Sequence, residues 1–235
     1  MKKTVKLLLS IFTMLSLCIC PSNKIKANDD SNSHVTINEL CETHFFINNE
    51  NQIIETAMCE VGNTIISSYR VINEDGSYTM TISDEKETYE INGITDYSTF
   101  YQIALNFMNS NNPYSRGCNM VGSNFKHVLV GFQPTVTLYA SGYAGDATLA
   151  EIASDITLVL GAVPASVILK VAKYALTFLS NSETFKVVIN TSTWEIRFSY
   201  DNVYYTHCYH QVLLGYNSQG TLIDRKEYYN QVIGG

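Results

Sequence analysis

Residues 145–180, GDATLAEIASDITLVLGAVPASVILKVAKYALTFLS, form an alanine-rich apolar block that decides the fold. Thr148 and Glu151 have the spacing of a capping box, in which a side chain at the start of a helix accepts from a free backbone N–H. Gly161 can adopt the left-handed conformation that ends many helices, and Pro164 suits the first turn of the next helix. The block therefore predicts a helical hairpin over about residues 148–180.

Both halves of the predicted hairpin carry an apolar stripe at helical spacing. The stripe residues are Leu149, Ile152, Ile156, Leu160, Ile168, Val171, Leu176 and Leu179. Such a hairpin either covers a sheet as a core element or opens to insert into a membrane, and the sequence leaves both alternatives open. Each half is shorter than the ~20 apolar residues that a membrane-spanning helix needs.

Short alternating runs that are typical of strands fill most of the remaining chain. Before the hairpin they are residues 53–59, 64–72, 77–83, 125–132 and 135–139; after it they are 185–189, 194–200, 203–214 and 221–228. Pro134 separates two of these runs, because an interior strand does not tolerate proline. Between residues 96 and 109 the apolar spacing is helical instead.

The order of these elements predicts an α+β fold. We expect an antiparallel sheet-rich body with one helix in the N-terminal half and the helical hairpin inserted between strands. The polar stretch around residue 112 is the best candidate boundary. It divides a strand-rich segment ending in a helix, 28–112, from an antiparallel sheet with the inserted hairpin, 113–235, and these segments form either two domains or one.

Residues 1–27 have the order of a secretory signal peptide. Lys2, Lys3 and Lys6 form a basic start, residues 7–19 are apolar, and Ala27 is the small residue before the expected cut. The apolar run is too short to span a membrane comfortably. We therefore expect a secreted, extracellular protein.

Cleavage after Ala27 makes the chain strongly acidic. It removes five of the 15 basic residues and none of the 22 acidic ones, so that 10 basic and 22 acidic side chains leave a formal net charge of −12. This charge argues against a nucleic-acid partner, because phosphates dominate such binding. It also argues against long-range attraction to anionic lipid.

Four cysteines remain in the mature chain: Cys41, Cys59, Cys118 and Cys208. In an exported protein they indicate up to two disulfides, with three possible connectivities. We favour Cys41–Cys59 and Cys118–Cys208, since each pair lies within or bridges plausible strand neighbours.

Features that could carry catalysis are weak in this sequence. His207, Cys208 and His210 resemble a metal-binding cluster, but in a strand the two histidines point to opposite faces, and zinc would need two further ligands. A disulfide cysteine between half-buried histidines is the favoured alternative. The sequence has no serine-hydrolase, zinc-protease, phosphate-loop or calcium-loop motif. We therefore predict no enzyme, no catalytic residue, no metal site and no cofactor.

The C-terminal part of the chain is rich in tyrosine. Its candidate binding face consists of Tyr200, Tyr204, Tyr205, Tyr209 and Tyr216. Such rings suit contacts with carbohydrate or protein. Alternating tyrosines are also ordinary strand formers, so a purely structural role is the alternative.

The combined plan of residues 114–235, which contain the alanine-rich block and the end YYTHCYHQVLLGYNSQG, resembles large, unmodified secreted bacteriocin-like proteins of low-GC Gram-positive bacteria. The resemblance implies inhibition of related bacteria, a target-cell envelope component or receptor as partner, and an immunity protein. It carries no catalytic or binding residue to this chain. The acidity departs from most membrane-killing peptides, which are cationic.

These observations favour a secreted, non-enzymatic antimicrobial or toxin-like protein that acts at the envelope of target bacteria. A secreted or surface-associated binding module that uses the tyrosine-rich sheet is the second hypothesis. A hydrolase with an unrecognised site is the third. The sequence leaves the oligomeric state open.

The exported protein is expected to begin at or near Asn28, because the basic, apolar and small residues end at Ala27. N-terminal sequencing of the exported product measures this directly. A cell-bound product that still begins at Met1 would contradict the prediction.

Overall fold

Five consecutive strands form the first sheet of the computed structural model, which describes residues 41–109, 116–117, 124–143 and 147–231. The strands are β1 (Cys41–Ile47), β2 (Ile53–Val61), β3 (Thr64–Ile72), β4 (Ser77–Ser83) and β5 (Thr88–Ile94). Each pairs antiparallel with the next. Alternating burial places one face of each inner strand in the core. The predicted runs at 53–59, 64–72 and 77–83 are confirmed, whereas β1 and β5 were not predicted.

The second sheet has the order β6-β11-β10-β9-β7, and β8 also pairs with β9. Its strands are β6 (Arg116–Gly117), β7 (Phe125–Phe132), β8 (Val136–Tyr139), β9 (Lys186–Phe198), β10 (Tyr204–Tyr216) and β11 (Leu222–Gln231). β7 and β8 lie end to end along β9, and the predicted break at Pro134 separates them. The separate strands predicted at 185–189 and 194–200 are wrong, because β9 is continuous. The polar residues between them still fit a strand, and Thr191 and Thr193 are buried within it.

Three α-helices complete the fold: α2 (Tyr97–Met108), α3 (Leu149–Leu160) and α4 (Ala165–Leu179). A short 3₁₀ turn, η2 (Ala140–Gly142), precedes α3. Thr148 caps α3 as predicted, accepting from the backbone N–H of Glu151 at 3.1 Å. Gly161 has φ −59°, so the predicted left-handed conformation is wrong. The chain leaves α3 through a right-handed turn, and Pro164 directly precedes α4 instead of lying in its first turn.

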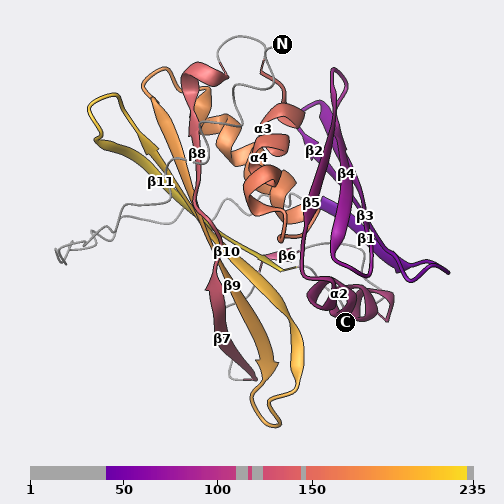
Figure 1. Cartoon of the computed structure of the whole chain (residues 1–235). Helices are drawn as coiled ribbons and strands as arrows, with labels where there is room; N and C mark the ends of the chain where they lie inside the picture. The colour runs from indigo at the N-terminus through magenta and orange to yellow at the C-terminus, as the bar shows by residue number, and fades with distance from the viewer. Residues whose placement is uncertain (1–40, 110–115, 118–123, 144–146, 232–235) are drawn as a thin grey trace. The chain divides into compact units, whose positions relative to one another are not determined.

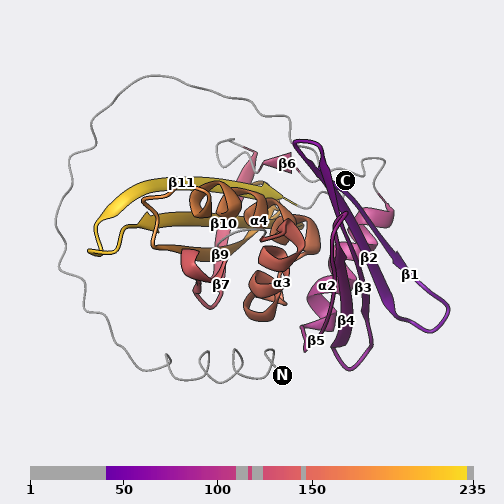
Figure 2. The same ribbon diagram turned by 90° about the horizontal axis from the view of Figure 1, so that it is seen from above.

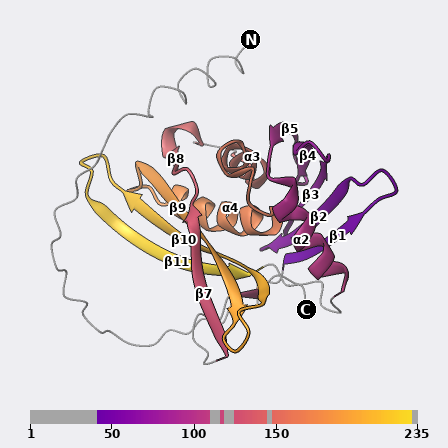
Figure 3. The same ribbon diagram turned by 60° about the horizontal axis from the view of Figure 1, so that its bottom comes forward.

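The helical hairpin lies between the two sheets, and the predicted α+β class is confirmed (Figures 1 and 2). α4 contacts β1, β2 and β3 on one side and β9, β10 and β11 on the other, while α3 contacts β4, β5 and β8. Figure 3 shows the same arrangement from a third direction. Two sheets therefore cover the hairpin, where the sequence predicted one.

Coverage from both sides explains the composition of the hairpin. All residues from 163 to 172 are buried, and all of them except Ser166 and Lys170 are apolar. Of the predicted stripe, six side chains are buried in the core and two are partly buried, Leu176 and Leu179. Among the described residues, no helix combines the length and apolar character needed to cross a membrane.

Residues from both predicted segments share one hydrophobic core. It contains, for example, Ile66 and Phe100 from the segment before residue 112 and Ile168 and Leu213 from the segment after it. These residues belong to a single compact unit, Asn38–Gly235. The predicted signal peptide, 1–27, lies outside the described residues.

A disulfide joins Cys41 to Cys59, as predicted. The two cysteines are directly opposite each other in the β1–β2 ladder, with their Cα atoms 4.4 Å apart. Cys208, buried in β10, is also disulfide-bonded. Its expected partner, Cys118, lies outside the described residues.

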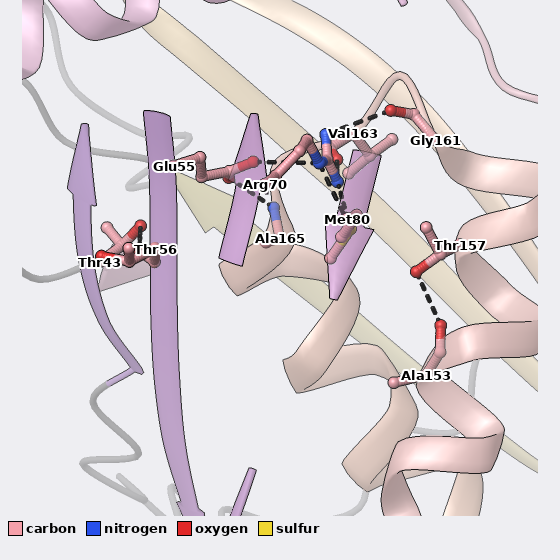
Figure 4. A network of polar contacts seen from close by, with 10 residues as sticks. All are labelled: Thr43, Glu55, Thr56, Arg70, Met80, Ala153, Thr157, Gly161, Val163 and Ala165. Atoms are coloured by element: carbon pink, nitrogen blue, oxygen red, sulfur yellow. Dashed lines mark hydrogen bonds and ion pairs between the residues drawn. The ribbon is translucent and has the colours of Figure 1, made fainter. Parts of the chain in front are cut away.

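An ion pair buried inside the core joins the first sheet to the hairpin (Figure 4). Glu55 on β2 lies directly opposite Arg70 on β3, and both side chains are fully buried. Arg70 Nε lies 3.4 Å from Glu55 Oε2. The rings of Tyr78 and Phe100 flank the guanidinium, with their centroids 5.0 and 5.3 Å from its central carbon.

The same two side chains bind the turn between α3 and α4 (Figure 4). Arg70 donates to the carbonyl oxygens of Gly161 and Val163, each at 3.2 Å. Glu55 Oε1 accepts from the backbone N–H of Ala165 at 2.6 Å. A cation thus lies at the C-terminal end of α3 and a carboxylate in the first turn of α4, as both helix dipoles favour. We refer to Glu55, Arg70 and these backbone groups as the turn clamp.

Arg70→Met is expected to lower the free energy of unfolding by about 3–5 kcal/mol, because it leaves a buried carboxylate without its counter-charge. Urea unfolding with the disulfides intact measures the loss. Glu55→Gln/Arg70→Met should recover part of it, since no buried charge remains.

Arg225→Ala is the matched control for this prediction. It removes a partly exposed ion pair with Glu227 and should cost only about 0–1 kcal/mol. An Arg70→Met variant as stable as Arg225→Ala would show that the turn clamp contributes little.

Candidate ligand-binding site

Two adjoining cavities lie at the turn of the hairpin and share Gln133 and Ala162. The first has a volume of about 160 Å³ and is lined by Thr95, Asp96, Thr99, Phe100, Val130, Gly131, Gln133, Ala162, Thr193, His207 and Tyr209. The second has a volume of about 260 Å³ and is lined by Tyr78, Ile91, Asn92, Gly93, Ile94, Gln133, Pro134, Leu158, Val159, Gly161 and Ala162. Together we call them the trough.

Junctions between secondary-structure elements supply part of the lining, and strands and helices supply the rest. Thr95 and Asp96 lie between β5 and α2, Gln133 and Pro134 lie in the break between β7 and β8, and Ala162 lies in the turn between α3 and α4. The turn clamp holds this last segment through Gly161 and Val163, on either side of Ala162. A rigid frame that presents loop residues is the usual construction of a binding site.

A β-bulge in β10 brings His207 and Tyr204 together. The register of β10 against β9 shifts between Tyr204 and Thr206, so that Tyr204 and His207 share a face despite being three residues apart. The Tyr204 hydroxyl lies 2.5 Å from His207 Nδ1. This contact engages Nδ1 of the imidazole. Burial lowers the pKa of His207 below its ordinary value, which favours the neutral ring.

Thr95 supplies a hydroxyl that lacks a partner among the described residues. Its residue is 9% exposed and lines the first cavity. Its backbone N–H donates to the carbonyl of Gly76 at 2.8 Å. Gly76 has φ +81°, and a Cβ there would collide with the Thr95 carbonyl, so the turn before β4 fixes Thr95 in place.

Gln133 connects the two cavities. Its Nε2 donates to Thr193 Oγ1 at 3.2 Å, which orients the amide and leaves Oε1 as an acceptor.

Asp96 is the only carboxylate in the described lining of the first cavity. Both of its oxygens accept hydrogen bonds from Ser98 and Thr99 in the first turn of α2. Those bonds, above all the one from the Thr99 hydroxyl, lower the pKa of Asp96. The carboxylate is therefore occupied by capping the helix.

Exposed apolar side chains border the trough. Ile94 is 82% exposed, Leu158 60% and Val130 56%. In the second cavity the Tyr78 hydroxyl lies close to Gly93 and Gly161, where a Cβ at either glycine would collide with it. The absence of both side chains therefore makes room for the Tyr78 ring.

The structure distributes the five predicted tyrosines over different surroundings, so they do not form one face. Tyr209 is 1% exposed and lines the first cavity from the core, which removes it from any outer surface. Tyr204 bonds His207, and Tyr205 packs on Phe125 and Phe198. Tyr200 is 79% exposed, whereas Tyr216 lies beside Lys186.

His207 and His210 lie on opposite faces of β10, as the strand period predicted. His207 lines the trough, whereas His210 stacks on Tyr229 with ring centroids 4.3 Å apart. Cys208 between them is disulfide-bonded. Within the described part of the chain, no group of three or more histidine, cysteine or acidic side chains could hold a metal ion.

Sequence reasoning missed Thr95, Gln133, Glu55 and Arg70. For the ion pair a signal existed, because Glu55 and Arg70 each occupy an inward position within an apolar alternation, where a charge needs a buried partner. Thr95 and Gln133 carry no such signal. Their importance depends on which loops meet in space.

Comparison of the chain with protein-family models, curated proteins and solved structures found no match. The function must therefore be argued from the site itself.

The free energy of unfolding is expected to fall as the pH drops from 7 to 5, in part because of His207. Its lowered pKa means that the unfolded chain takes up the proton first, so its contribution is complete above about 6.5 and is lost as the pH falls toward the folded-state pKa. One such group changes stability by at most about 1.4 kcal/mol per pH unit.

His207→Gln should reduce the difference in stability between pH 7 and pH 5, as measured by urea unfolding at each pH. Glu55 acts in the opposite direction, since burial raises its pKa, so the comparison of the two proteins isolates His207. Equal differences in both proteins would contradict the prediction.

Proposed function

We propose that this chain is an exported, non-enzymatic protein that recognises a component of the envelope of target bacteria through the trough, in an antimicrobial or toxin-like role. The observation that carries the proposal is the combination of a buried, unpartnered Thr95 hydroxyl with an exposed apolar rim. Burying an unpartnered polar group costs free energy. A ligand that bonds Thr95 while covering Ile94 and Leu158 would recover that cost.

Export is supported by three observations. Residues 1–27 have the order of a signal peptide. A disulfide joins Cys41 to Cys59, and Cys208 is disulfide-bonded as well. Such bonds persist in oxidising compartments outside the cytosol.

A binding role fits the trough better than catalysis. Hydrolysis of a glycosidic bond usually needs two free carboxyl groups, and the first cavity has only Asp96 in its described lining, already occupied as a helix cap. His207 is engaged by Tyr204 through Nδ1. These groups can orient a ligand by hydrogen bonds without reacting with it.

Recognition through the trough also requires no opening of the hairpin. Membrane insertion would have to withdraw α3 and α4 from two sheets and break the turn clamp, which would leave Glu55 and Arg70 without their backbone partners. Depriving a buried ion pair of its hydrogen-bonding partners costs free energy. The hairpin therefore acts as part of the rigid frame that holds the site.

The disulfide-bonded protein is expected to bind the surface of susceptible bacteria and inhibit their growth. Fluorescently labelled protein, applied to a panel of Gram-positive and Gram-negative strains, measures binding by flow cytometry alongside growth. Ile94→Asp should weaken binding about tenfold or more, because it places a charge in the apolar rim at the cost of a large exposed hydrophobic contact.

Tyr200→Asp is the matched control, since Tyr200 is equally exposed but lies outside the trough. It should leave binding unchanged. Loss of binding with Tyr200→Asp but not with Ile94→Asp would favour the tyrosine-rich surface. Absence of binding and of inhibition across the panel would reject the proposed function.

A further inference from the structure

Most polar groups in the lining of the first cavity are uncharged. Thr95 offers a hydroxyl, Gln133 an amide oxygen and His207 a ring nitrogen. Tyr209 lines the same cavity, and burial raises its pKa, so it is a neutral phenol. Asp96 is occupied by the first turn of α2. Those bonds keep Asp96 ionised, so an anionic ligand would be repelled here and would lose its hydration without gaining a counter-charge.

The first cavity has the size of one sugar ring. A water molecule occupies about 30 Å³ in the liquid, so a cavity of about 160 Å³ has room for about five waters. This is the space of one pyranose ring with its substituents. Hydroxyl groups both donate and accept, and therefore match a lining of hydroxyl, amide and imidazole groups without a change of charge.

The second cavity extends the site in one direction. It adjoins the first at Gln133 and Ala162, and its walls are the Tyr78 ring, Pro134, Ile94 and Leu158. Apolar and aromatic side chains of this kind pack against the C–H faces of a sugar ring. Gln133 lies where two linked rings would meet.

We propose that the trough binds an uncharged oligosaccharide, with one ring in the first cavity against Thr95, Gln133 and His207 and the next ring in the second cavity. This inference rests on the proposed function and names the ligand class of the same site. The observations favour a glycan over a peptide, because the described lining of both cavities holds no lysine or arginine to pair with a peptide carboxylate, and Asp96 already accepts hydrogen bonds from Ser98 and Thr99.

Triacetylchitotriose and cellotriose are suitable probes, since both are neutral trisaccharides. Titration of the disulfide-bonded protein by isothermal calorimetry or ligand-observed NMR is expected to show saturable binding of at least one of them. Trigalacturonate, a trisaccharide of the same length that carries carboxylate groups, should bind about tenfold more weakly or not at all, because Asp96 repels it. A neutral tripeptide such as Ser-Asn-Ala should not bind.

Thr95→Val provides a sharp test, because it removes the hydroxyl and nearly preserves the shape. Loss of one hydrogen bond to the ligand should weaken saccharide binding about tenfold. Stability should be unchanged or increased, since the lost hydroxyl has no partner among the described residues. Thr184→Val is the matched control: Thr184 is also buried with an unpartnered hydroxyl, but it lies outside both cavities and should leave binding unchanged.

Three outcomes would overturn the inference: failure of both neutral trisaccharides to bind, tighter binding of the charged trimer or of the tripeptide, or equal saccharide binding by wild type and Thr95→Val. Cell binding separates this failure from failure of the proposed function. If Ile94→Asp abolishes binding to bacteria while no saccharide binds, the trough recognises the envelope but the glycan assignment is wrong. Loss of saccharide binding in Thr95→Val, with unchanged binding by Thr184→Val, supports the inference.

Discussion

The buried contact between Glu55 and Arg70 connects the first sheet, the hairpin and the trough. Removing two charges from water is costly, and an isolated ion pair with a separation of 3.4 Å would not offset this desolvation cost well. Here the guanidinium also binds two carbonyls at the end of α3, and the carboxylate binds a free N–H in the first turn of α4. Backbone groups that the helix ends leave unsatisfied are therefore the partners that make the ion pair tolerable.

Sheets on both sides of the hairpin determine where a ligand site can form. The helices and the inner faces of the sheets are packed with apolar side chains, and the small residues Ala165, Ala172 and Ala175 are completely buried. Space remains at the hairpin turn, where the β5–α2 junction and the break between β7 and β8 come close to Ala162. Bulges at Val130 and Tyr205 redirect β7 and β10 near this point.

The acidity of the chain limits how it could approach an anionic surface. The full sequence has a formal net charge of −7, so long-range attraction to anionic surfaces is absent and binding to them must come from short-range contacts. A trough with uncharged polar groups inside and apolar side chains at its rim supplies contacts of that kind. Disulfide bonding at Cys41, Cys59 and Cys208 adds rigidity to the strands of both sheets.

Local sequence determined the elements of this protein: the capping residue Thr148, the break at Pro134, the alternation in β2 to β4 and the pairing of Cys41 with Cys59 depend on neighbours along the chain or across one ladder. Tertiary structure alone decided the second sheet over the hairpin, the right-handed turn at Gly161 and the inward position of Tyr209. Arg70 bonds carbonyls more than 90 residues away, and one bulge reverses the alternation of a strand. Thr95 and Gln133 became site residues because separate loops converge, and no local pattern encodes that convergence.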